Sequence, residues 1–221
     1  MHKKFIEHLK YVHKKRFHEK KVSRRTLFFM REYGPKSHVA TVIIRQSLLV
    51  LLFATTLSLM GGIGLESAKQ KITQVLPLLI LIPALNDMIG DFGTIVSSKI
   101  TTMLYLGHIK RNVLGEKEVR KMLSAVVLIA LASAVYLGVA SSALSMLMGF
   151  TLTTNVLLKI VLISLLMAFT LVTIIILISV FGSLIIYKRG DDPDNFLIPI
   201  TTSAADAGSL VMLYFVVSAL F

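Results

Sequence analysis

Long apolar runs separated by short polar stretches occupy the chain from about residue 42 onward. Five runs are long enough to cross the ~30 Å hydrocarbon core of a bilayer as helices, since one crossing takes about 20 residues. The runs cover approximately 42–63, 74–102, 122–148, 156–187 and 196–220. The pattern therefore predicts an all-α integral membrane protein with five transmembrane helices.

The stretches between these runs are predicted to be loops, and they differ in charge. They are "ESAKQK" at 66–71, "GHIKRNVLGEKEVRK" at 107–121, "GFTLTTN" at 149–155 and "YKRGDDPDN" at 187–195. Lys and Arg concentrate in the second and fourth loops and ahead of the first run. Because basic residues mark the cytoplasmic side, the N-terminus is predicted to lie inside and the C-terminus outside.

The composition agrees with a membrane protein, being 55% hydrophobic with a mean hydropathy of +0.77. The net charge of +12 arises largely in the first 45 residues, which hold 13 of the 24 Lys and Arg. Residues 1–40 are thus expected to form a basic cytoplasmic segment that contacts anionic lipid headgroups and does not bind nucleic acid. Phe5, Leu9 and Val12 suggest that part of it is an amphipathic helix, and 41–221 form the membrane domain.

Three acidic residues interrupt the apolar runs: Asp87 and Asp91 in the second, and Asp206 in the fifth. Asp87 and Asp91 are four residues apart, so they project from one stripe of a helix. Asp206 and Asp91 are expected at similar depths near the midplane, where each charge costs at least ~2.5–3.5 kcal/mol. The acids must therefore be protonated, pair with a mobile cation or serve catalysis.

Proline occurs in both acidic helices, as Pro77 and Pro83 in the second and Pro199 in the fifth. Proline leaves a backbone carbonyl without its helical donor, and paired interrupted helices are typical of transport sites. Carboxylate and carbonyl oxygens suit Mg²⁺, Ca²⁺ or Mn²⁺, and Mg²⁺ retains much of its water. These features favour a pathway for a partly hydrated divalent cation.

Two stretches resemble the MgtE-type magnesium channels and the related solute-carrier magnesium transporters. "PALNDMIGDFGTIVSSKITT" is similar to their second-helix signature, and "DPDNFLIPITTSAADAGSL" to their fifth helix, with Asn195, Pro199 and Asp206 at the family's intervals. The resemblance implies Mg²⁺ transport by a homodimer with its pore between the second and fifth helices at the two-fold axis. It implies that Asp206 is the main ion ligand, helped by backbone oxygens around Thr202 and Ile198.

The chain departs from the family pattern in having Asp91 where the family has Asn, and Asp87 where it has a small residue. Both changes make the pathway more acidic, and they leave open a sodium- or proton-coupled divalent cation exchanger. The candidate ion ligands are Asp206, Asp91, Asp87, Asn86, Thr202 and Ile198.

Intramembrane aspartyl proteases also use membrane-depth Asp residues with a Gly-x-Gly-Asp motif, but Met88 stands where the first Gly should be, and Pro83-Ala84-Leu85 precedes the acids instead of following them. The sequence is therefore predicted not to be an enzyme. A non-transporting membrane scaffold is the remaining alternative, and it would tolerate loss of the acids.

Overall fold

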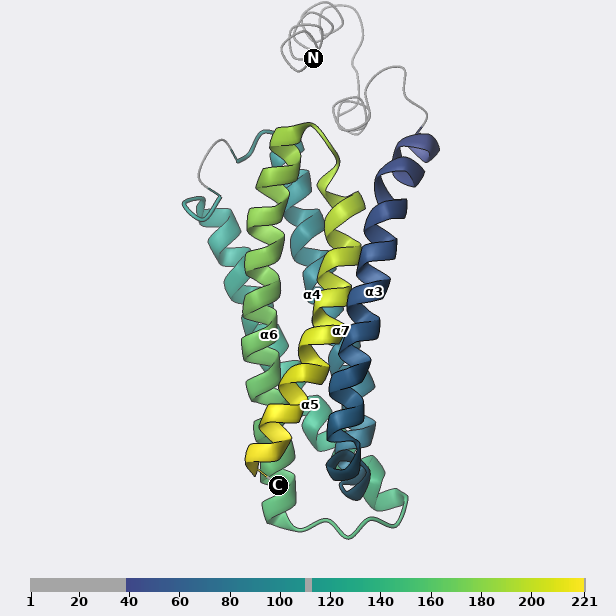
Figure 1. Ribbon diagram of the computed structural model, residues 1–221. Coiled ribbons are helices and arrows are strands. Elements are labelled where there is room, and N and C mark those ends of the chain that lie inside the picture. Colours follow the sequence, from purple (N-terminus) through teal and green to yellow (C-terminus); the bar gives the residue numbers. More distant parts are fainter. Residues whose placement is uncertain (1–38, 110–112, 221) are drawn as a thin grey trace, which may run out of the picture.

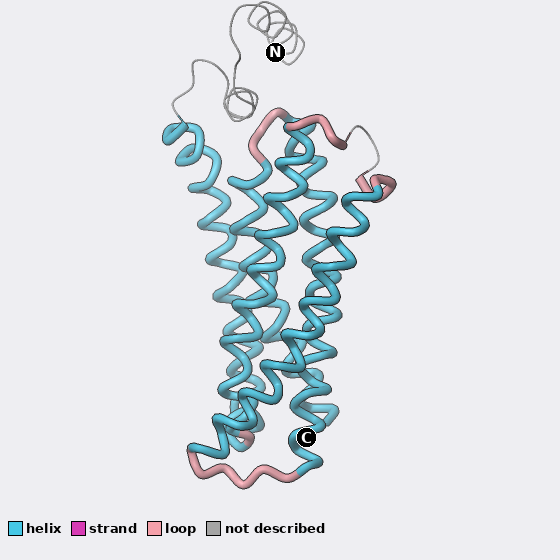
Figure 2. Tube along the Cα trace, turned by 180° about the vertical axis from the view of Figure 1, so that it is seen from behind, coloured by secondary structure: helices cyan, strands magenta, loops and turns pink. Residues whose placement is uncertain are grey.

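The computed structural model describes residues 39–109 and 113–220, and this part of the chain is a bundle of long helices without strands (Figures 1 and 2). The helices are α3 (Val39–Gln74), α4 (Leu76–Tyr105), α5 (Lys117–Leu147), α6 (Thr154–Arg189) and α7 (Pro193–Leu220). All five are long and apolar enough to cross a membrane, which confirms the predicted spans. The predicted amphipathic stretch around Phe5 lies outside the described residues.

The helices alternate in direction along the bundle (Figure 1). The start of α3, the α4–α5 connection and the α6–α7 connection share one end, here called the basic end because its residues include Lys117, Lys121, Lys188 and Arg189. The short α5–α6 loop and the end of α7 lie at the opposite end. Placement of the basic end in the cytoplasm remains a prediction from its charge.

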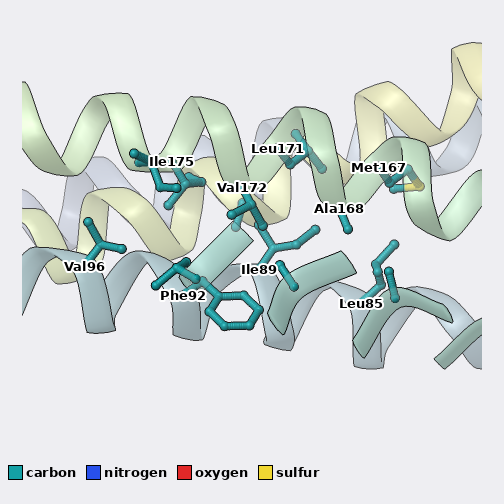
Figure 3. Packing of buried hydrophobic residues seen from close by; sticks show 14 of the residues in the cluster. Leu85, Ile89, Phe92, Val96, Met167, Ala168, Leu171, Val172 and Ile175 are labelled. Carbon is teal, nitrogen blue, oxygen red and sulfur yellow. The ribbon is translucent and has the colours of Figure 1, made fainter. Parts of the chain in front are cut away.

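The interior is built chiefly from α4 and α6, which run in the same direction (Figure 3). Apolar side chains from the two helices interdigitate there, among them Leu85, Ile89 and Val96 of α4 and Met167, Leu171 and Ile175 of α6. Helix α6 is hydrophobic on every side, as expected for a helix that contacts both protein and lipid.

Glycines allow α3 and α7 to approach closely, and these two parallel helices form the most extensive helix pair in the bundle. A Cβ atom added to Gly61 would lie 2.8 Å from the Cα atom of Ala207, and one added to Gly64 would lie 3.3 Å from the backbone of Leu210. Such small-residue contacts replace the hydrophobic effect as a source of helix association within a membrane.

The predicted loop at 66–71 is wrong, because α3 continues as a helix to Gln74. This stretch lacks Gly and Pro and is rich in good helix formers, and Lys69 Nζ pairs with Glu66 Oε1 at 3.3 Å, one turn away. The chain leaves the helix only at Val75, two residues before Pro77.

Pro77 also differs from its expected role, because it occupies the first turn of α4, where its missing N–H breaks no helical bond. Only Pro83 interrupts the interior of α4. At the start of α7, Asp192 is the N-cap, because its Oδ1 accepts a hydrogen bond from Asp194 N at 3.1 Å.

The pair Gly61→Ala and Gly62→Ala tests the α3–α7 contact. The first substitution places a methyl group against the backbone of Ala207, so we expect about 1–3 kcal/mol of destabilisation from overpacking. Gly62 has open space around it and serves as the control, with a neutral or slightly stabilising effect. Thermal denaturation in detergent measures both, and equal stability of the two variants would contradict the close contact.

Candidate ion-binding site

Asp206 lies near the middle of α7, and its side chain is only partly buried. Its Oδ2 atom accepts a hydrogen bond from Ser58 Oγ of α3 at 3.2 Å. The close approach of Gly61 to Ala207 brings the two helices together next to this hydrogen bond. Among the described residues, Asp206 forms no ion pair, so a neutral hydroxyl is the partner that the protomer supplies.

Asn86 of α4 lies at the same level of the bundle as Asp206. The two helices run in opposite directions, and they meet where Gly90 faces Thr202 at van der Waals distance. Asn86 is one turn from Gly90 and Asp206 one turn from Thr202, both toward the end opposite the basic end. Asn86 Oδ1 is buried and has no hydrogen-bond partner among the described residues. An amide oxygen and a carboxylate therefore share one depth.

The predicted backbone ligands lie one and two turns from Asp206, on the side toward the basic end. Thr202 Oγ1 donates to the carbonyl oxygens of Ile198 at 3.0 Å and Pro199 at 3.1 Å. Thr201 Oγ1 also donates to Ile198 O at 3.2 Å, so this carbonyl is already well supplied with donors. The carbonyl that loses its helical donor to Pro199 is that of Asn195, four residues earlier.

Asp87 and Asp91 lie on the surface of the protomer. They are part of one exposed stripe of α4, here called the acidic stripe, that also includes Pro83 and Ile95. The prediction that the two carboxylates share a face is confirmed. Within residues 39–109 and 113–220, however, no three Asp, Glu or His side chains come together as a metal-binding cluster. A single protomer thus does not gather Asp87, Asp91 and Asp206 around one ion.

The described chain thus has five helices long and apolar enough to cross a membrane, and two of them carry carboxylate or amide oxygens well inside their length. The MgtE family model, described as a divalent cation transporter, matches residues 82–216, which is more than half of the chain. The chain therefore belongs to the MgtE family and functions in divalent cation transport, not in catalysis. No curated protein and no solved structure matches it.

The matched segment begins within α4 and ends within α7, so it contains every candidate ligand predicted from the sequence. It leaves out α3, whose Ser58 was missed in the sequence analysis. The available signal was the spacing of Ser58, Gly61 and Gly64, since small residues three apart mark a face where helices pack closely.

Ser58→Ala tests the support that α3 gives to Asp206. The substitution removes the donor that orients the Asp206 carboxylate, so we expect a several-fold fall in transport at limiting cation concentration. Thr56→Val is the control, because Thr56 Oγ1 bonds to Leu52 O of its own helix at 2.9 Å. Uptake into proteoliposomes measures the effect, and an equal response of both variants would argue against a role for Ser58.

Proposed function

We propose that the chain forms a homodimer in the cell membrane that conducts Mg²⁺ through a pore between α4 and α7 of the two copies. Asp206 is the main ligand of the partly hydrated ion. Asn86, Asp91 and Asp87 supply further oxygens along α4, and the backbone around Ile198 and Thr202 continues the path on α7. The N-terminus is cytoplasmic, where its basic residues contact anionic lipids.

The observation that carries this proposal is the environment of Asp206. Its carboxylate sits halfway along a membrane-crossing helix, with a neutral Ser58 hydroxyl as its hydrogen-bond donor and no ion pair within the described residues. A charge at this depth costs at least ~2.5–3.5 kcal/mol unless it is compensated. A transported cation supplies that compensation, and Asn86 Oδ1 at the same level offers a second, unused oxygen ligand.

The nature of the donors supports Mg²⁺ as the ion. Carboxylate and amide oxygens are hard ligands, and Mg²⁺ is usually bound by one or two carboxylates while retaining several waters. The protomer offers few carboxylates at any one depth, which fits a hydrated Mg²⁺ better than Ca²⁺, with its demand for six to eight oxygens. Mn²⁺ shares the preference for oxygen ligands and is expected to be carried as well.

A second copy is needed because Asp87 and Asp91 are exposed on the protomer. Facing lipid, both carboxylates would lie in hydrocarbon without any partner, which membrane proteins avoid by directing such residues toward a bundle interior or a water-filled cavity. Pairing the acidic stripes of two copies across a hydrated pore removes this cost. The same symmetry brings the two Asp206 side chains toward one path.

Asp206→Asn is expected to reduce Mg²⁺ uptake into proteoliposomes about tenfold or more, because a neutral amide replaces the charged ligand. Asp87→Asn and Asp91→Asn are expected to reduce uptake mainly at low Mg²⁺ concentration, where electrostatic attraction of the ion to the pore limits the rate. Glu66→Gln is the charge-matched control, since Glu66 is exposed and paired with Lys69. Undiminished uptake by folded Asp206→Asn would favour a scaffold over a pore through this residue.

The same assay separates a channel from a coupled exchanger. Uptake by a channel depends on the Mg²⁺ gradient and voltage alone, whereas an exchanger also responds to an imposed sodium or proton gradient. The acidic α4 stripe is compatible with both, so these gradients are varied with the Mg²⁺ gradient held constant.

Single-cysteine variants test the dimer, since the natural chain has no cysteine. We expect Ile95→Cys to cross-link between copies with a short bifunctional thiol reagent, because Ile95 lies on the acidic stripe of α4 and is 47% exposed in the protomer. Leu128→Cys on α5, at a site 70% exposed, is the lipid-facing control. Cross-linking of Leu128→Cys but not Ile95→Cys in membranes would place the dimer contact elsewhere.

A further inference from the structure

A second group of buried polar atoms lies nearer the basic end, away from Asp206. Ser97 Oγ and Thr101 Oγ1 of α4, Ser183 Oγ of α6 and Asp194 Oδ1 of α7 are all buried without a hydrogen-bond partner among the described residues. The Ser97 and Ser183 side chains are 0% exposed and Thr101 is 1% exposed. Buried oxygens are normally hydrogen-bonded, so four unpartnered ones on three neighbouring helices require an explanation.

Helix contacts bring these oxygens to one region. On α4 and α6, which run in parallel, Ser179 Oγ donates to Gly93 O at 3.4 Å. Ser183 and Ser97 each follow one turn later toward the basic end, so they lie at a common level. The third helix joins them where Gly182 of α6 packs directly against the Leu197 side chain of α7.

Asp194 lies one turn from Leu197 on α7, again toward the basic end. Its carboxyl group is close to the hydroxyls of Thr101 and Ser98 on α4. Within residues 39–109 and 113–220, Asp194 Oδ1 and Thr101 Oγ1 nevertheless form no hydrogen bond of good geometry. Carboxylate and hydroxyl oxygens that are buried near one another without well-formed hydrogen bonds are the kind of donor set expected at a cation site.

Their position on helices does not explain why these hydroxyls lack hydrogen bonds. Ser142 of α5, equally buried, donates to Gly138 O of its own helix at 2.8 Å, and Thr102 of α4 donates to Ser98 O at 2.8 Å. A hydroxyl at Ser97, Thr101 or Ser183 could likewise donate to a backbone carbonyl one turn earlier on its own helix.

An acidic neighbour and two helix C-termini add negative charge to this region. Asp192, whose side chain is buried, lies beside Asp194 and accepts a hydrogen bond from its backbone N–H. Helices α4 and α6 both end at the basic end, where the carbonyl groups of their last turns carry partial negative charge. Lys188 and Arg189 are exposed, outside this buried group.

We propose that Ser97, Thr101, Ser183 and Asp194 form a second cation site, inside each protomer, that binds a dehydrated monovalent cation such as Na⁺. One carboxylate balances one positive charge, and the hydroxyls supply neutral oxygens in place of water. Mg²⁺ sheds its water reluctantly, and Ca²⁺ takes more oxygens and usually more carboxylates, so neither suits this set. The site is about 18 Å along α7 from Asp206 at ~1.5 Å per residue, and is therefore separate from the proposed pore ligand.

The site has a mechanical consequence for transport. It joins α4 and α7, the helices that carry Asp91, Asp87 and Asp206, to the apolar α6. Na⁺ bound there holds the three helices in one relative position. Sodium thereby acts on the conformation of the transport helices without occupying the Mg²⁺ path.

Sodium binding is tested on the full-length purified protein in detergent, without divalent ions. The thermal midpoint and the binding of radioactive ²²Na⁺ are measured in NaCl and in choline chloride at equal ionic strength. We expect Na⁺ to raise the midpoint of the natural protein, and Thr101→Val and Ser183→Ala to lose most of this increase and most of the bound ²²Na⁺. In choline chloride both variants should be at least as stable as the natural protein, because each loses an unpartnered buried hydroxyl.

Two controls make the result specific. Ser142→Ala removes a buried but hydrogen-bonded hydroxyl and should keep the full response to Na⁺. Asp206→Asn should also keep it, so failure of the proposed Mg²⁺ pore would not be mistaken for failure of this site. Equal stabilisation by choline chloride, an undiminished Na⁺ response in Thr101→Val and Ser183→Ala, or Mg²⁺ acting through these residues in place of Na⁺ would each overturn the proposal.

Discussion

A carboxylate in the hydrocarbon region of a bilayer must be compensated, and the arrangement of this bundle depends on how that is achieved. The protomer contributes a neutral hydroxyl, that of Ser58, to Asp206, and leaves Asp87 and Asp91 on its surface. Within the described residues no basic side chain pairs with these acids. In the proposed dimer, the positive charge comes from the cation that the MgtE family transports, and the pore lined by two copies gives the surface acids access to it.

Small residues make this arrangement possible. The Gly61–Ala207 contact brings α3 against α7, and the Gly90–Thr202 contact brings α4 against the same helix from another side. The adjacent Gly93 has no room for a side chain, since a Cβ atom would lie 2.8 Å from Thr201 Cβ. Asp206 is thus held on a helix fixed by backbone contacts, so its carboxylate can be positioned without a charged partner.

Hydropathy was sufficient to predict the five spans, because length and apolar composition are nearly the whole requirement for crossing a bilayer. It failed at 66–74, where polar residues with high helix propensity extend α3 past its apolar run. It also began the fifth span at 196, whereas α7 begins at Pro193 with Asp192 as its N-cap, since proline is favoured at the first helical position.

The candidate site was only partly accessible from the sequence. Their charge and the nearby prolines identified Asp87, Asp91 and Asp206 as candidate ligands, because charged residues and prolines both interrupt an otherwise apolar pattern. Ser58 could not be paired with Asp206 without knowing that α3 packs on α7, and helix neighbours in a bundle do not follow from the order of spans. The unpartnered oxygens of Ser97 and Ser183 were hidden for the same reason, since a serine in an apolar helix usually bonds to its own backbone.

The most direct test of charge compensation is to locate the ion. Crystals of the protein grown with Mn²⁺, which scatters anomalously, should show a peak between two copies at the depth of Asp206, within coordination or one water molecule of both carboxylates. A dimer with Mn²⁺ bound elsewhere and Asp206 facing lipid would contradict the account. So would an Asp206 carboxylate compensated by a basic residue of the partner.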